Sequence, residues 1–286
     1  MLSRPYRYCV FLTLACAFLS SRAFAGLDSA PLMLQNEFLD AHFGANGLQS
    51  FNDHALQKSF AVADNTFSLT IDNHEILSRK LNPPEIRKDP DAIEYTFHSI
   101  PYRIQVIYEL KSKWHFVSKR ILVSTESGNR RFRVDHIQVL GGEISEHTAG
   151  VFVPHSFWTR VSKKVNDYAL FVRLKDRTGI YMLVQNPFLS VESEGEKFAI
   201  SYSPEMDWDV ANGPFESDRA CIGAYRLSGQ MVSTEIIPEW KWEPQGAGNN
   251  ESGEDQAEIE AFMDCVRAFI LPHQKPNDTH RFVSAQ

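Results

Sequence analysis

The sequence predicts an all-β fold, a large antiparallel sandwich of two sheets, followed by one C-terminal amphipathic helix. Between Pro31 and Pro238, short runs rich in β-branched and aromatic residues recur, each bounded by Gly, Asn, Asp, Ser or Pro. Within many of these runs apolar and polar residues alternate, which is the period of a strand with one buried face. Residues 254–271 instead show helical spacing. Together these observations favour sheets first and a helix last.

The first 25 residues have the form of a signal peptide. Arg4 and Arg7 precede an apolar run from Tyr8 to Leu19, and Ala23-Phe24-Ala25 has the small-x-small pattern of a cleavage site. The apolar run is shorter than the roughly 20 residues that span a bilayer, so cleavage is favoured over an N-terminal anchor. We therefore expect an exported protein, periplasmic or extracellular, without membrane association after cleavage.

Residues 26–244 are predicted to form the β-sandwich domain. The clearest strand segments are, in order, LMLQNEFLDAHF, FSLTI, IEYTFHSI, YRIQVIYEL, WHFVSKRILVS, FRVDHIQVL, DYALFVRL, GIYMLVQNPFLSVE, KFAISYS, RACIGAYRL and MVSTEII. No helical segment separates them, and many short strands without crossover helices pack best as two antiparallel sheets.

Net charge and cysteine usage narrow the partners and the chemistry. The formal charge is −7, and cleavage would remove Arg4, Arg7 and Arg22, so neither nucleic acid nor an anionic membrane surface is an expected partner. Of the four cysteines, Cys221 and Cys265 would remain. In an oxidising compartment they form either a disulfide between strand and helix or two separate buried thiols.

The C-terminal region is predicted as a linker (245–253), a helix (254–271) and a polar tail (272–286). Ser252 and Asp255 resemble a capping box, and Pro272 ends the helix because proline cannot continue it. One helix face is apolar, formed by Ile259, Phe262, Met263, Val266, Phe269 and Ile270. This face requires a cover, either the sandwich of the same chain or a partner.

Residues suited to catalysis are sparse. The ten histidines include no HExxH motif and no pair at i, i+4, so neither a metal site nor a cofactor is expected. Asp207 and Asp209 flank Trp208 and would share one strand face, as paired carboxylates for glycoside hydrolysis would. The favoured interpretation is a polar edge with a core tryptophan.

Aromatic residues suited to sugar stacking are better represented. Trp158 lies in PHSFWTR, and Trp240 and Trp242 lie in PEWKWEP, each beside polar side chains. Flat aromatic faces next to hydrogen-bonding groups are what a carbohydrate surface requires. Trp240 and Trp242 would share one strand face, so the alternative is that both pack under the terminal helix.

Several segments, in order, resemble the N-terminal region of secreted bacterial glycoside hydrolases of the α-galactosidase type. They are LQNEFLDAHFGANGLQSFND, YRIQVIYELKSKWHFVSKRILV, YMLVQNPF, YSPEMDW, IGAYRLSG and DQAEIEAFMDCVRAFIL. The resemblance covers residues 31–283 and implies a β-supersandwich similar in fold to galactose mutarotase, leading through a linker helix toward a catalytic (β/α)₈ barrel.

The departures from that family limit what the resemblance implies. The family's nucleophile and acid/base lie on barrel strands, which have no counterpart in this chain, and the mutarotase His and Glu pair has no match in it. The resemblance implies only that His155 and Trp158 approach a sugar from the sandwich side. The substrate-binding hypothesis therefore comprises His155, Trp158, Trp208, Asp209, Trp240 and Trp242, and no catalytic residue.

Two hypotheses for the function follow. The first is a non-catalytic β-sandwich module of a truncated or split glycoside hydrolase, which contacts carbohydrate or docks a separate catalytic barrel. It predicts an exposed apolar stripe on the terminal helix. The alternative is a self-sufficient carbohydrate-active enzyme, an epimerase or lyase with its site on the concave sheet face. That alternative predicts a pocket in which His and Glu or Asp side chains converge.

Overall fold

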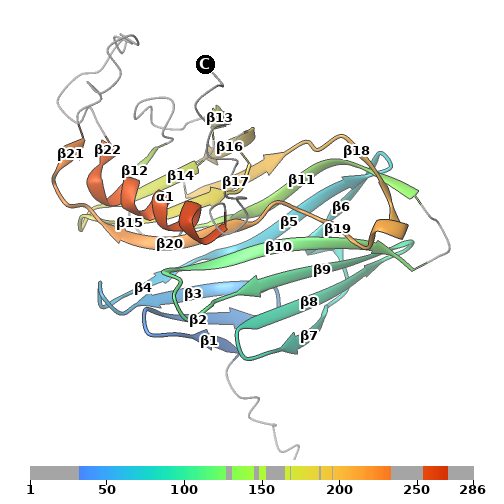
Figure 1. The fold of residues 1–286 in the computed structure, drawn as a ribbon, viewed down its shortest axis with the longest axis horizontal. Helices are drawn as coiled ribbons and strands as arrows, with labels where there is room; N and C mark the ends of the chain where they lie inside the picture. The colour runs from blue at the N-terminus through green and yellow to red at the C-terminus, as the bar shows by residue number, and fades with distance from the viewer. Residues whose placement is uncertain are drawn as a thin grey trace, which may run out of the picture. The chain divides into compact units, whose positions relative to one another are not determined.

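A computed structural model describes residues 32–126, 131–144, 148–152, 165–167, 169–186, 188–194, 196–232 and 254–269. In these residues antiparallel strands predominate, and one α-helix follows them near the C-terminus (Figure 1). The predicted all-β sandwich with a C-terminal helix is confirmed.

The largest sheet has nine described strands, arranged in the order β12-β14-β15-β20-β10-β9-β8-β7, with β19 paired to β10. Their bounds are β7 Glu85–Lys88, β8 Ala92–Ser99, β9 Tyr102–Glu109, β10 Phe116–Thr125, β12 Thr148–Phe152, β14 Ala169–Leu174, β15 Thr178–Val184, β19 Phe215–Glu216 and β20 Ala220–Arg226.

A second sheet has seven described strands in the order β13-β16-β17-β11-β5-β6, with β18 paired to β11. Their bounds are β5 Ala63–Ile71, β6 His74–Leu77, β11 Arg131–Glu143, β13 Val165–Asp167, β16 Leu189–Glu194, β17 Lys197–Tyr202 and β18 Met206–Asp209.

The remaining described strands form two smaller sheets. The first is a meander of β1 Met33–Gln35, β2 Leu39–Gly44, β3 Gly47–Asp53 and β4 Lys58–Ala61, and the second pairs β21 Met231–Val232 with β22 Glu254–Asp255. Two 3₁₀ turns, η1 Ser78–Lys80 and η3 Val210–Asn212, interrupt the connections, and α1 spans Gln256–Phe269.

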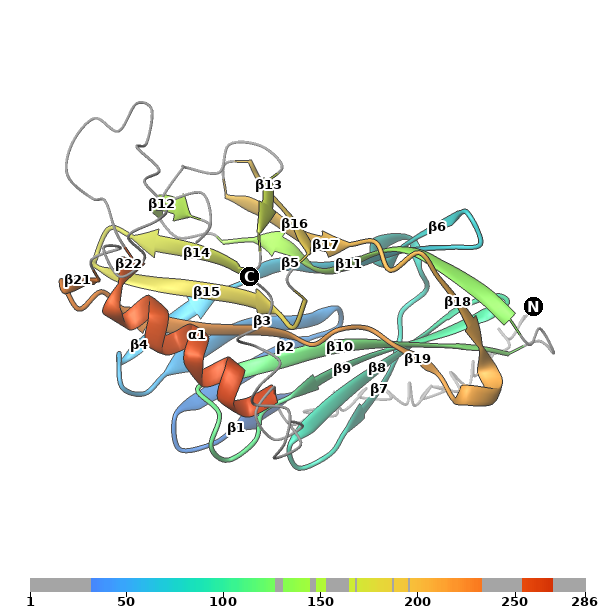
Figure 2. The same ribbon diagram turned by 45° about the horizontal axis from the view of Figure 1, so that its top comes forward.

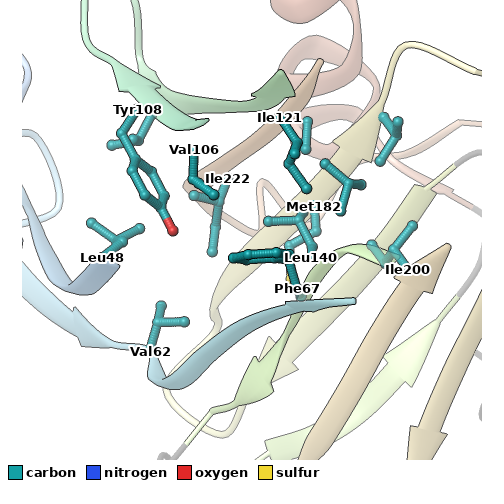
Figure 3. Packing of buried hydrophobic residues seen from close by; sticks show 14 of the residues in the cluster. Leu48, Val62, Phe67, Val106, Tyr108, Ile121, Leu140, Met182, Ile200 and Ile222 are labelled. Carbon is teal, nitrogen blue, oxygen red and sulfur yellow. The ribbon is translucent and has the colours of Figure 1, made fainter. Parts of the chain in front are cut away.

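The main core lies between the nine-stranded and seven-stranded sheets. Phe67 on β5 packs edge-on against Phe97 on β8, with ring centroids 5.3 Å apart. At another point, Tyr102 on β9 packs against Phe132 on β11 at 5.9 Å. Figure 3 shows side chains from both sheets pointing into this layer. Burial of these aromatic and β-branched faces is the main force that holds the sandwich closed.

The four-stranded meander extends the same core. Phe43 packs edge-on against Tyr108 with ring centroids 5.2 Å apart, and the Tyr95 hydroxyl donates to the Gly44 carbonyl at 2.7 Å. At its far strand, the Lys58 ammonium lies 2.8 Å from Asp176, in the turn between β14 and β15. The meander is therefore fixed to the nine-stranded sheet by both apolar and ionic contacts.

Three strands of the large sheet are buried on both faces. On β15, Ile180 and Met182 point into the main core, whereas Tyr181 and Leu183 belong to a second apolar cluster on the opposite face. The strands β14 and β20 divide their side chains in the same way. Such strands read as continuous apolar runs because a second layer covers them.

The second layer is α1, which packs along β20 and β15 (Figures 1 and 2). Its buried face consists of Glu258, Ala261, Cys265 and Phe269. The prediction of an exposed apolar stripe on the terminal helix is therefore wrong, because the chain's own sheet covers the helix. The face that packs is also offset from the predicted one, since Ile259, Met263 and Val266 are only partly buried.

The start of α1 differs from the prediction. The helix begins at Gln256, two residues later than the predicted start at residue 254. Glu254 and Asp255 instead form the short strand β22, which pairs with β21. Asp255 accepts from the amide of Ala257, and Glu258 accepts from the amide of Asp255 at 3.1 Å. Asp255 and Glu258 thus form the capping box. Ser252 lies outside the described residues.

In the part of the chain that the structure describes, the one helix is too short and too polar to cross a bilayer. The predicted signal peptide, linker and polar tail lie outside the described residues.

Candidate functional site

Of the six residues predicted to contact sugar, the structure describes Trp208 and Asp209. His155, Trp158, Trp240 and Trp242 lie outside the described residues. Trp208 packs against the main core, with its ring edge-on to Phe215 at 5.5 Å, and its indole nitrogen donates to the Gly213 carbonyl at 2.9 Å. The tryptophan therefore holds the turn after β18, as the favoured interpretation of this segment expected.

Asp209 serves the same turn. One carboxylate oxygen accepts from the amide of Ala211 at 2.9 Å and caps η3, while the other lies 3.3 Å from Arg131 Nε. The strand β18 places Asp207 on the same face, where its side chain is 81% exposed and pairs loosely with Arg133. Both carboxylates therefore engage side chains or amides of the chain itself.

Cys221 and Cys265 come together beneath α1. Cys221 lies on β20 and Cys265 on α1, both are buried free thiols, and both belong to one buried apolar cluster in which Cys265 lies close enough to affect the Cys221 thiol. Burial raises the pKa of the Cys221 thiol, because the thiolate would be desolvated there. A disulfide between Cys221 and Cys265 remains a prediction, and the two residues belong to the same buried cluster.

The most organised polar group on the large sheet is an alternating set of two arginines and two glutamates, here called the Arg–Glu ring: Glu109, Arg120, Glu216 and Arg219. Arg219 Nη1 donates to Glu109 at 2.6 Å, and Arg120 Nη1 donates to Glu216 at 2.7 Å. The ring closes through longer contacts, 3.6 Å between Arg120 Nε and Glu109 and 3.9 Å between Arg219 Nη2 and Glu216.

The Arg–Glu ring lies where α1 ends. The guanidinium of Arg219 lies over the ring of Phe269, 5.7 Å from its centroid. Side-chain exposures range from 12% at Glu109 to 47% at Glu216, so the set is anchored in the sheet and open to solvent on one side. Paired donors and acceptors held in fixed positions can recognise hydroxyl groups, which both donate and accept.

A strongly exposed aromatic residue, Phe188, lies in the loop after β15. Phe188 is 84% exposed, and its amide donates to the Asn186 side chain at 2.8 Å. The side-chain nitrogen Nδ2 of Asn186 in turn donates to the carboxylate of Asp218 at 2.9 Å, and Asp218 precedes Arg219 in the sequence. The loop after β15 is thereby tied to the start of β20. Sequence reasoning missed Phe188 because it lies within an apolar run that reads as a strand.

Lys119 is a buried cation of the core, and its pKa is strongly lowered. It lies on β10 between the two large sheets, and its ammonium donates to the Asn65 side chain at 2.8 Å and to the Thr66 carbonyl at 3.2 Å. Burial lowers the pKa of Lys119 to about 7, because the charged form is desolvated. These contacts join β10 to β5 and make Lys119 a core residue with a neutral form accessible near physiological pH.

The alternative hypothesis requires a pocket in which His and Glu or Asp side chains converge. A small hollow between β14 and β17 is lined by four apolar side chains and by Thr148, Ser193, Glu196 and Lys197. Its lining includes no histidine. Among the described residues, no three His, Cys, Asp or Glu side chains are grouped as metal ligands would be.

Comparisons with known proteins give likenesses only to solved structures. No family model matches the sequence, and a search of curated proteins finds no match. A galactose mutarotase related enzyme from Lactobacillus acidophilus is 11% identical with a TM-score of 0.43, covering 67% of this chain and 96% of that one. A putative aldose 1-epimerase from Escherichia coli K12 is 9% identical with a TM-score of 0.41, covering 68% and 98%.

An α-N-acetylgalactosaminidase from Bifidobacterium bifidum is 9% identical with a TM-score of 0.49. The match covers 68% of this chain and 36% of that one, so this chain spans about a third of the larger enzyme. The structural neighbours thus include epimerase-type folds and part of a glycoside hydrolase. The activities in these names are those of the neighbouring proteins.

Proposed function

We propose that this chain is an exported, non-catalytic β-sandwich module of a glycoside hydrolase that contacts carbohydrate. The observation that carries the proposal is the exposed ring of Phe188, whose loop is held through Asn186 to Asp218, next in sequence to Arg219 of the Arg–Glu ring. An aromatic face beside ordered hydrogen-bonding groups suits a sugar, whose apolar face stacks while its hydroxyls are bound.

The same surface does not have the form of a hydrolytic site. Glycoside hydrolysis uses two carboxyl groups that flank the scissile bond, one of which must deliver a proton. In the Arg–Glu ring both carboxylates are already bound to guanidinium groups, at 2.6 and 2.7 Å. The arginine contacts go to one oxygen of each carboxylate, Oε2 of Glu109 and Oε1 of Glu216, so hydrogen bonding to sugar hydroxyls is the role that this arrangement supports.

The test is calorimetric titration of galactosides into the wild-type chain and into Phe188→Ala. We expect saturable binding by the wild type, and a dissociation constant raised roughly tenfold by loss of the stacking face. Phe188→Tyr keeps an aromatic face and should bind like the wild type. The matched control is Ile100→Ala, because Ile100 is also an exposed apolar residue, at 88%, but lies in the turn between β8 and β9.

The same preparations should be assayed for galactoside hydrolysis and aldose anomerisation. Rates at background, together with binding that depends on Phe188, would support the proposal. Turnover by the wild-type chain would overturn its non-catalytic part. Absence of binding to every galactoside, or equal loss in Ile100→Ala, would overturn the carbohydrate part.

A further inference from the structure

The contact between Cys221 and Cys265 joins two elements that are distant in sequence. Cys221 is 2% exposed on β20, and Cys265 is 5% exposed on α1, in a cluster that also contains Tyr181 and Phe171. Both thiols belong to the same buried cluster, and Cys265 is among the groups that act directly on the Cys221 thiol.

The docking of α1 enforces this approach from both ends of the helix. Near its start, Arg173 on β14 holds Glu258 through two hydrogen bonds of 2.8 and 2.9 Å. At its end, Phe269 packs against Trp114 and Phe116, with ring centroids 5.2 and 5.5 Å away. Cys265 lies between Glu258 and Phe269 in α1, and α1 packs along β20, so the docking of the whole helix sets the position of Cys265.

We propose that Cys221 and Cys265 are an oxidation site, a dithiol that a small-molecule disulfide converts into a covalent clamp between α1 and β20. One cysteine thiolate attacks the oxidant, forming a mixed disulfide and releasing one small thiol. The second thiolate then displaces the other small thiol. The protein loses two electrons and two thiol protons, and one oxidant disulfide becomes two thiols. The inference is independent of the proposed carbohydrate role.

Burial determines when the reaction occurs. The thiolate is the reactive form, and an apolar environment disfavours it. Oxidation should therefore be slow in the docked protein and fast while α1 is undocked, as during folding. Once the helix has packed, the same burial shields the disulfide from reductants. The clamp closes a loop of the chain, which stabilises the folded state chiefly by restricting the unfolded one.

The test uses the full chain carrying Cys9→Ser and Cys16→Ser, so that only the proposed pair can react. The protein is refolded from denaturant with oxidised glutathione, digested without reduction and analysed by mass spectrometry. We expect a peptide linking Cys221 to Cys265, formed much faster during refolding than in the folded protein. The oxidised form should melt roughly 5 to 10 °C above the reduced form.

The control is Cys265→Ala, which removes the pair while keeping the Cβ carbon and the apolar character of the site. Its melting temperature should be the same with and without oxidant. Two free thiols after oxidative refolding, or glutathione adducts without the Cys221–Cys265 link, would overturn the proposal. If Cys265→Ala fails to fold, alkylation of the native and unfolded parent protein still decides whether the two thiols disappear together.

Discussion

A buried ion pair is the most demanding residue-level feature of the molecule. Arg173 and Glu258 have side-chain exposures of 6% and 1%, and the Tyr225 hydroxyl also donates to Glu258 at 2.9 Å. Two desolvated charges are tolerated in a protein interior only when each is paired and hydrogen-bonded. Burial and the nearby Glu258 carboxylate raise the pKa of Tyr225, so this hydroxyl remains a donor throughout the physiological range.

Replacing Glu258 by glutamine should strongly destabilise the fold. The variant removes the carboxylate that Arg173 holds through two hydrogen bonds and keeps the guanidinium buried, and breaking a buried ion pair costs about 3–5 kcal/mol of unfolding free energy. Denaturant unfolding measures the loss. Asp264→Asn is the matched control, because it removes a carboxylate of α1 that pairs with Arg267 on the exposed side. Its effect should stay within about 0.5 kcal/mol, and equal losses in both variants would contradict the account.

Lys119 makes stability depend on pH. Its folded-state pKa of about 7 lies below the value of an exposed lysine, so the unfolded chain binds more protons between these values. The unfolding free energy should therefore rise from pH 7 toward pH 10, by up to about 1.4 kcal/mol per pH unit from this residue.

The test is the difference in unfolding free energy between the wild type and Lys119→Met across this pH range. Methionine keeps the apolar length without an ionisable group, so the difference between the two proteins should change with pH. Lys88→Met on the exposed strand β7 provides the control and should run parallel to the wild type. Parallel curves for Lys119→Met as well would show that the buried amine does not titrate as described.

At the scale of the element, α1 shows both what the sequence can predict and where it fails. Helical spacing and acidic residues at its start predicted its existence. The predicted packing face was wrong because Glu258 resembles a solvent-exposed acid in the sequence. The partner of Glu258, Arg173, lies 85 residues earlier. A local pattern cannot contain a pair at that separation. The available signal was the largely apolar sequence of β14 and β15, which is typical of strands covered on both faces.

Asp255 fixes the start of the helix and the preceding turn together. It accepts from the amides of Ala257, Ser228 and Gly229, and these hydrogen bonds lower its pKa against the opposing effect of burial. Asp255→Ala should cost about 1–2 kcal/mol or more, since a cap alone is worth about that much. Glu260→Gln on the exposed face of α1 is the control. A loss no larger than that of the control would contradict the capping role.

At the scale of the whole molecule, the sequence predicted the two-sheet sandwich because alternation and turn residues are local signals. The candidate site was harder to predict. Trp208 and Asp209 have the composition of a binding motif, yet the turn at Gly213 and Ala211 satisfies their polar groups. The Arg–Glu ring joins β9, β10, β19 and the residue that precedes β20, and no single segment of sequence contains it.

The predicted export of the chain can be tested separately. If residues 1–25 are a signal peptide, intact-mass analysis of protein recovered from the exported fraction should show Gly26 as the first residue. Retention of Met1 in that fraction would contradict cleavage after Ala25. The control is Ala25→Phe, which removes the small residue at the cleavage site and should leave the leader attached.

Carbohydrate binding without catalysis is tested most directly by a nuclear magnetic resonance titration of the ¹⁵N-labelled chain with a galactoside. We expect saturable shifts at the amides of Phe188, Asp218 and Arg219, with no product signals from the sugar during the experiment. Saturable shifts confined to other parts of the sandwich, an absence of shifts, or the appearance of hydrolysed sugar would contradict this prediction.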